Sequence, residues 1–232
     1  MGAIFYRTLR NAVRLVRIQT IRQTALNSDR VCRAGGFVLA CTHISHIEPI
    51  VLSAAMRRQV HWVARQEFYR YGVARFILNA SGAVPIDRFG SPIIGVRTAA
   101  QLARVGRCVG IFPEGGIAKG SQSVLGGGSI KGGACSIAID ASVPIVPAVI
   151  LGTDGLTTVK SWIPLPRKPV FFAFGRDIHP PTSGGPRRSR RLQMKHAVEQ
   201  EFRAVYSELV AALDSDHSKL TAAIDSRPIE PN

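Results

Sequence analysis

Long apolar runs, acidic residues and aromatic residues are all scarce in this chain of 232 residues. Its most apolar stretch, residues 136–152, is interrupted by Asp140, Pro144 and Pro147. No segment therefore reaches the roughly 18 apolar residues that a membrane-spanning helix needs, and we expect no such span. The first residues also lack the apolar core and the small-residue cleavage site of a secretory leader.

Cysteine is rare and scattered. Cys32, Cys41, Cys108 and Cys135 show no C-x-x-C spacing, so neither a cysteine zinc site nor a disulfide framework is expected. This usage favours a reducing, cytoplasmic setting.

Acidic residues number 15 against 30 lysines and arginines, which gives a net charge of +15. A hydrophobic content of 46% excludes a disordered basic tail, because such a chain can build a core. The charge favours a polyanionic partner: nucleic acid, an anionic membrane face or a phosphorylated small molecule. A non-catalytic protein that binds nucleic acid or anionic lipid is the alternative interpretation. Only 7% of the residues are aromatic and no recognisable nucleic-acid-binding module is present, so we expect no nucleic acid as a partner.

Short apolar runs typical of buried strands alternate along the chain with segments of helical pattern. We expect strands at 37–41, 60–64, 83–87, 109–112, 145–151 and 169–174. We expect helices at 49–58, 66–79, 91–106, 133–141 and 192–213, with a basic loop at 180–191. This alternation predicts a single α/β domain whose mostly parallel sheet is covered by helices on both faces. Functional residues are then expected beyond the carboxyl ends of the strands.

Residues 4–22 have the pattern of a basic amphipathic helix. One face carries Phe5, Leu9, Ala12, Val13 and Val16, and the opposite face carries Arg7, Arg10, Arg14 and Arg17. Such a helix suits an anionic membrane surface. A first helix packed on the core, with its arginines in water, fits the pattern equally well.

His43 follows the expected strand 37–41, and Glu48 comes five residues later, where a helix begins. This spacing can bring the carboxylate to one ring nitrogen and leave the other nitrogen free to accept a proton. A structural histidine and a metal site that also uses His46 are the alternatives. The His-x-x-His-x-Glu order lacks the helical zinc spacing, so we expect no metal and regard His46 as an exposed neighbour of the site.

Two further strands end in residues suited to a phosphate. The strand at 83–87 leads into Arg88, and the strand at 109–112 leads into Glu114, Gly115 and Gly116, where backbone N–H groups can approach a ligand. A surface ion pair and an ordinary glycine turn are the alternatives. Ser45 lacks the strained elbow of an acyl-enzyme nucleophile.

Taken in order, His-x4-acid, Gly-x4-Asp-Arg, Phe-Pro-Glu-Gly and Val-Pro-Ile-Val-Pro resemble the glycerolipid acyltransferases of the 1-acylglycerol-3-phosphate acyltransferase type, over residues 37–151. The resemblance implies that His43 is the general base and Glu48 its charge partner. It also implies that the substrate-binding residues are Arg88, Glu114, Gly115 and Lys131. The implied division is a membrane-surface helix at 1–30, an acyltransferase domain at 31–213 and a polar tail at 214–232.

The implied reaction moves a fatty acyl group from a thioester, acyl-CoA or acyl carrier protein, to a hydroxyl of a lysophospholipid, without any cofactor. The implied location is peripheral, on the cytoplasmic face of the cell membrane. The chain departs from the family at Thr42, where Asn is usual, at Glu48, where Asp is usual, and at Ile117, where an arginine is usual. We expect either that Lys119 or Lys131 replaces this arginine or that the acceptor is not a simple phosphomonoester.

Overall fold

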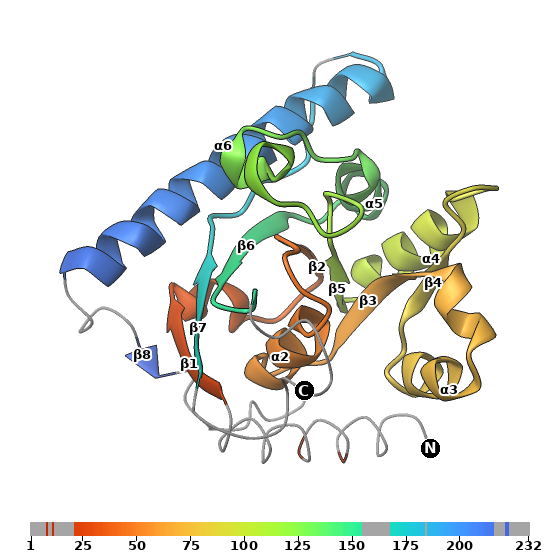
Figure 1. The fold of residues 1–232 in the computed structure, drawn as a ribbon. Helices are drawn as coiled ribbons and strands as arrows, with labels where there is room; N and C mark the ends of the chain where they lie inside the picture. Colours follow the sequence, from red (N-terminus) through yellow and green to blue (C-terminus); the bar gives the residue numbers. More distant parts are fainter. Residues whose placement is uncertain are drawn as a thin grey trace.

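The computed structural model describes residues 8, 11, 21–154, 168–183, 185–215 and 221–222. These residues form an eight-stranded sheet in the order β4-β3-β5-β2-β6-β7-β1-β8 (Figure 1). The strands are β1 (Ile21–Leu26), β2 (Phe37–Cys41), β3 (Val60–Arg65), β4 (Val84–Ile86), β5 (Cys108–Ile111), β6 (Ile145–Leu151), β7 (Lys168–Phe174) and β8 (Thr221–Ala222). The first five in spatial order are mutually parallel, whereas β7 runs antiparallel to β6.

Helices cover both faces of this sheet (Figure 1). The α-helices are α2 (Glu48–Ala55), α3 (Gly72–Ala80), α4 (Ile93–Arg104), α5 (Gly133–Ala141) and α6 (Arg187–Ser215). Short 3₁₀ turns are η1 (Ser28–Val31), η2 (Gln66–Arg70), η3 (Gly120–Gln122) and η4 (Val124–Gly126). The expectation of an α/β domain with a mostly parallel sheet between helices is confirmed. No helix of the described residues is both long enough and apolar enough to cross a membrane.

Alternation along β2 divides the core into two layers. Phe37, Leu39 and Cys41 pack with α2 on one face, whereas Val38 and Ala40 pack with α4, α5 and α6 on the other. All five β2 residues are buried, as a central parallel strand requires when helices cover both sides. The central strand is therefore rigidly held, and its carboxyl end is where His43 follows.

Three expectations need correction. Ile21 and Arg22, the last residues of the expected helix at 4–22, belong to β1, which pairs in parallel with β7. Of the remaining residues of that helix, only Thr8 and Asn11 are described, and both are helical. The expected helix at 66–79 is divided into η2 and α3 because Tyr71 has an extended backbone. The expected loop at 180–191 ends early, since α6 begins at Arg187.

Candidate active site

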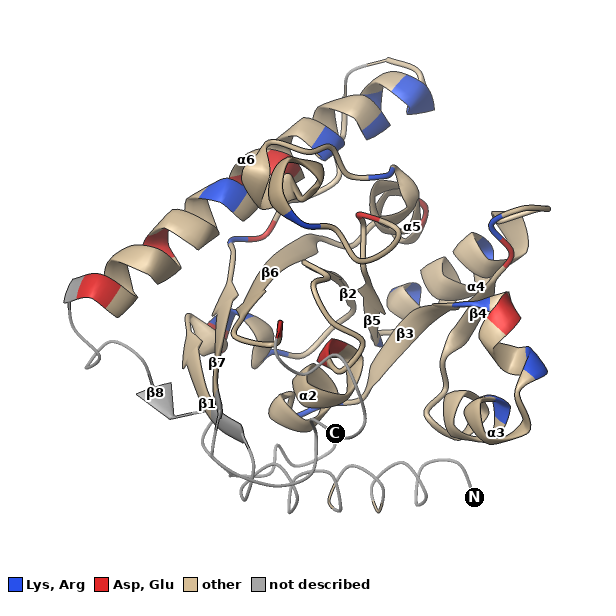
Figure 2. Cartoon of the chain, viewed as in Figure 1, with Lys and Arg blue, Asp and Glu red and all other residues tan. Residues whose placement is uncertain are grey.

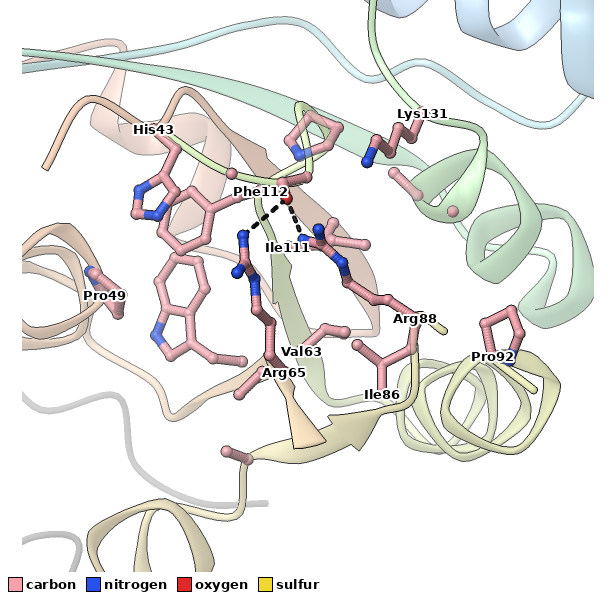
Figure 3. A pocket seen from close by; sticks show the side chains of 18 of the residues that line it. His43, Pro49, Val63, Arg65, Ile86, Arg88, Pro92, Ile111, Phe112 and Lys131 are labelled. Carbon is pink, nitrogen blue, oxygen red and sulfur yellow. Dashed lines mark hydrogen bonds between the residues drawn. The ribbon is translucent and has the colours of Figure 1, made fainter. Parts of the chain in front are cut away.

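Three aromatic rings from three neighbouring strands line up at the carboxyl edge of the sheet. His43 follows β2, Phe112 follows β5 and Trp62 lies on β3, in the spatial order of these strands. The rings of His43 and Phe112 stack with centroids 4.0 Å apart, and those of Phe112 and Trp62 with centroids 4.8 Å apart. The stack fixes the plane of the imidazole, which Figure 3 shows beside Phe112.

Glu48 holds one edge of this imidazole. Its Oε2 lies 2.6 Å from His43 Nδ1, and its side chain is fully buried. The backbone N–H groups of Ile44 and Ser45 each donate to Oε1 at 2.9 Å, and the Thr153 hydroxyl donates to Oε1 at 2.8 Å. Because each of these groups donates, the carboxylate is stabilised in a fixed orientation at the start of α2.

This arrangement defines the tautomer of His43. A carboxylate only accepts hydrogen bonds, so the proton between His43 and Glu48 belongs to Nδ1. Nε2, on the opposite side of the ring, then carries a lone pair on the side of a cavity that His43 lines. The structure thus brings together the histidine and the carboxylate that the sequence pairs, in the geometry of a general base.

The cavity has a volume of about 1310 Å³ and is bounded mainly by apolar side chains. These include Ile50, Ala54, Val63, Phe68, Ile77, Leu78, Ile86, Phe89, Val96, Ile111 and Leu192. His46 also lines it, is exposed and lies with its ring centroid 6.2 Å from that of His43, as expected of a neighbour of the site.

An inner group of cations lies near the Gly115 carbonyl. The guanidiniums of Arg65 and Arg88 both donate to this oxygen, as the dashed lines of Figure 3 show. Gly115 has a φ of +80°, and a Cβ there would lie 2.7 Å from Lys131 Nζ, so glycine is required for this packing. In the described part of the chain, no carboxylate forms a salt bridge with Arg65, Arg88 or Lys131. The group is therefore suited to an anion.

An outer group of cations comes from α6. Arg188, Arg191 and Lys195 line the same cavity, one above another along the helix. The Arg191 side chain passes close to Gly132, where a Cβ would lie 3.2 Å from its Cδ. Figure 2 shows basic residues gathered on the first turns of α6. Of the two lysines expected to replace the missing arginine, Lys131 lines the cavity together with Ile117, and Lys119 does not.

Glu114 is one of the residues that the resemblance assigns to substrate binding. It does not line the cavity. Its Oε2 accepts from the backbone N–H of His43 at 3.0 Å, and its Oε1 accepts from the Ser123 hydroxyl at 2.8 Å and the Val124 N–H at 2.9 Å. Both oxygens are thus used to tie the His43 loop to η4, so the geometry favours a bracing role over contact with substrate.

Neither Ser45 nor Cys41 is placed to attack a substrate. Ser45 is fully buried, and its N–H donates to Glu48. Burial raises the pKa of the Cys41 thiol well above its usual value, and the neighbouring charges of Glu48 and Glu114 raise it further. The Cys41 thiolate is consequently disfavoured.

Sequence reasoning missed three parts of the site: Thr153, Arg65 and the α6 cations. Thr153 follows β6, the parallel neighbour of β2, and Arg65 is the last residue of β3. The rule that selected Arg88, a polar side chain at the end of a parallel strand, applies equally to both. The α6 residues carry no such signal, because their distance along the sequence hides their place beside the cavity.

The chain was compared with known proteins. A model of the family described as "Acyltransferase" matches residues 18–151, which is more than half of the sequence. The chain belongs to this family. The match begins just before β1 and ends with β6, so it includes the strands that carry His43, Arg65, Arg88 and Gly115.

This acyltransferase is similar to a curated relative and to a solved structure. It is 29% identical over 148 residues to the 1-acyl-sn-glycerol-3-phosphate acyltransferase of Bacillus subtilis strain 168, covering 63% of this chain and 71% of the relative. The crystal structure of the 1-acyl-sn-glycerophosphate acyltransferase of Thermotoga maritima superposes with a TM-score of 0.62 and 17% identity, covering 89% of this chain and 80% of that one. The second similarity establishes the fold.

Proposed function

We propose that the protein transfers a fatty acyl group from a thioester to the free hydroxyl of 1-acylglycerol-3-phosphate, as a step of phospholipid synthesis. The observation that carries this proposal is the pairing of His43 with Glu48 at one end of an apolar cavity whose inner cations have no carboxylate partner among the described residues. The activity of the Bacillus subtilis relative supports the same acceptor.

In this mechanism the acceptor hydroxyl donates a hydrogen bond to Nε2 of His43. As its oxygen bonds to the thioester carbonyl carbon, the proton moves to Nε2, and Glu48 stabilises the resulting imidazolium. The tetrahedral intermediate then collapses, the carbon–sulfur bond breaks, and the imidazolium returns the proton to the departing sulfur. The products are the new ester and a free thiol, and no covalent enzyme intermediate is needed.

The inner cations fit the phosphate of the acceptor. Arg88 and Lys131 are the residues that the sequence identifies for this role, and Arg65 adds a second guanidinium. With Ile117 in place of the family's arginine, Arg65 supplies from β3 the bidentate contact that is lost from the loop after β5. A hydroxyl-bearing lipid without a phosphomonoester is the alternative acceptor.

The outer cations fit the acyl donor. Acyl-CoA and acyl carrier protein both hold their thioester on a phosphopantetheine arm, which carries a phosphate. We assign this phosphate to Arg188 and Arg191 on α6, which lie on the same cavity as His43. The apolar walls between the two cation groups then receive the acyl chains.

We also assign the protein to the cytoplasmic face of the cell membrane, as a peripheral protein. The amphipathic pattern of residues 4–22 supports this location, because four arginines would face anionic headgroups while apolar residues enter the interface. This helix lies almost entirely outside the described residues.

The direct test is product analysis with a panel of lysophospholipids and neutral lysolipids, each offered with acyl-CoA and with acyl carrier protein. We expect labelled phosphatidate from 1-acylglycerol-3-phosphate and the wild-type protein. Efficient turnover of another lipid hydroxyl, with none of 1-acylglycerol-3-phosphate, would move the assignment to that acceptor. Absence of product from every pair of substrates would overturn the proposal.

A further inference from the structure

Large apolar side chains are strongly exposed on two segments beside the cavity. Between η2 and α3 and at the start of α3 these are Tyr71 and Val73, which are 69% and 75% exposed. On the segment that leads into α4 they include Phe89 and Ile94, which are 87% and 74% exposed. Exposed apolar groups of this size are uncommon when a surface faces only water.

The first segment contributes little to the core. Neither η2 nor α3 contains a buried residue, although α3 carries five apolar side chains from Val73 to Leu78. Figure 1 shows α3 at the edge of the molecule beside β4, away from the layers that cover the centre of the sheet. Core packing therefore does not account for the composition of this helix.

Both apolar segments continue into the cavity. Phe68 and Ile77 of the first segment and Phe89 of the second are exposed and also line the cavity that holds His43. An acyl chain that enters between the segments would meet apolar surface along its whole path. This continuity indicates a partner that supplies acyl chains.

The charge beside the two segments is positive. Residues 65–98 contain five arginines and only two acidic residues, Glu67 and Asp87. Arg70, Arg75 and Arg97 are exposed, and Figure 2 shows basic residues on α3 and α4. Apolar side chains bordered by arginines match a layer of anionic headgroups over hydrocarbon. In a symmetric contact between two copies, the same arginines would instead face one another.

We propose that η2, α3 and residues 89–94 form a docking surface for an anionic lipid bilayer, which sets the opening of the cavity against the membrane. This surface is distinct from the basic amphipathic pattern of the first twenty residues. The proposal rests on the proposed function only for its choice of a lipid partner, and it concerns binding rather than the reaction.

Site-specific fluorescence can test this contact without interference from the N-terminal helix. Ile94→Cys and Val73→Cys would each be labelled with a polarity-sensitive dye, in full-length protein that also carries Cys32→Ser. The other three cysteines are buried. Val105→Cys is the matched control, because Val105 is 59% exposed but lies at the opposite end of α4.

Vesicles of phosphatidylcholine with phosphatidylglycerol should shift the emission to the blue at positions 94 and 73, with little change at position 105. Phosphatidylcholine alone should give a smaller shift. An equal response at all three positions, or a response at position 105 only, would overturn the proposal. A blue shift that depends on protein concentration without vesicles would instead identify an interface between copies. A blue shift that requires acyl carrier protein would identify a protein partner. Either result would overturn the proposal of a bilayer contact.

A binding measurement complements the fluorescence. The triple variant Val73→Asp, Phe89→Asp and Ile94→Asp should partition to anionic vesicles about tenfold less than wild type, whereas Val105→Asp should match wild type. Unchanged partitioning would contradict the proposal. If wild-type protein docks as expected but produces no acylated lipid, the docking surface stands and the proposed function fails.

Discussion

The two ends of the cavity are held in place by different interactions. At the His43 end, Glu48 and Thr153 are fully buried, and Glu48 is held by hydrogen bonds from the loop after β2 and from Thr153 after β6. At the α3 end, no residue of η2 or α3 is buried, and the exposed side chains include several large apolar groups. A proton transfer needs atoms fixed to a fraction of an ångström, whereas a long acyl chain needs only a continuous apolar surface. The contrast thus separates the residues that set rate from those that set access.

The largest expected effect is at the fixed end. His43→Ala should lower kcat/KM by about 10² to 10⁴ while leaving the fold intact, because the lost group accepts a proton at a strand end rather than packing in the core. His46→Ala is the matched control, since His46 lines the same cavity without touching Glu48. Assays of both purified variants, with circular dichroism as the check of folding, would decide. A folded His43→Ala protein with more than about a tenth of wild-type activity would contradict the assignment.

Glu48 should come next. Glu48→Gln should reduce kcat by about 10²-fold because the amide stabilises the imidazolium less well. Glu48→Asp is more informative: its carboxylate is one methylene shorter and cannot keep the contacts with Ser45, Thr153 and His43 together. We expect a lower kcat, although Asp is the usual residue of the family. An Asp variant as fast as wild type would show that the longer side chain is not matched to this site.

Variants of the inner and outer cation groups should raise the KM of different substrates. Arg65→Ala should raise KM for 1-acylglycerol-3-phosphate by roughly 10- to 150-fold, the equivalent of one lost charged hydrogen bond, with little change in the KM of the donor. Arg191→Ala should have the reverse pattern. If Ile117→Arg rescues Arg65→Ala, Arg65 replaces the family's arginine. Equal effects of both variants on both substrates would contradict the division.

The helix predicted near the N-terminus should affect membrane binding rather than the reaction. Replacing Arg7, Arg10, Arg14 and Arg17 by glutamine should weaken binding to anionic vesicles, since each such arginine contributes about 1 kcal/mol near the surface. Sedimentation at two salt concentrations measures the change. Equal sedimentation of wild type and variant at low salt would return this helix to a packing role.

The smallest effect concerns stability. Burial lowers the pKa of His61, and Arg107 and Arg58 lower it further. Their effect exceeds that of the hydrogen bond with the Gly82 carbonyl, which raises this pKa. The unfolded chain therefore binds this proton more readily than the folded protein does. The contribution of His61 to folding stability is fully present above pH 6.5, the ordinary pKa of histidine, and is lost as the pH drops below that value. In thermal melts across this range, His61→Gln should flatten the decline; an unchanged slope would exclude His61 as its cause.

Most of the sheet follows from the sequence because its strands are short, apolar and bounded by helices. β1 was missed because Ile-Arg-Gln-Thr-Ala-Leu has little apolar character and continues the spacing of the preceding basic helix. Its pairing with β7 is a tertiary effect that no local pattern records. The break at Tyr71 was missed for a similar reason, since the apolar spacing on either side is helical.

The contact between His43 and Glu48 could be predicted because the two residues are five positions apart, on either side of a single strand-to-helix turn. Glu114 shows where such reasoning ends: the sequence marks it as important, but which side of the β5 loop its carboxylate faces depends on residues 123 and 124. Arg191 could not be found at all, because only the packing of α6 beside Gly132 brings it to the cavity.

The Gly115 carbonyl binds the two arginines that we assign to the phosphate of the acceptor. This neutral oxygen accepts hydrogen bonds from the guanidiniums of both Arg65 and Arg88. A guanidinium gains a charge–charge attraction and two parallel hydrogen bonds from a phosphate, neither of which a single neutral carbonyl can offer. A phosphate that reaches these arginines would therefore displace the carbonyl as their hydrogen-bond acceptor. Gly115 directly follows Glu114, whose carboxylate accepts from the His43 N–H, so one short loop joins the proposed phosphate site to the general base.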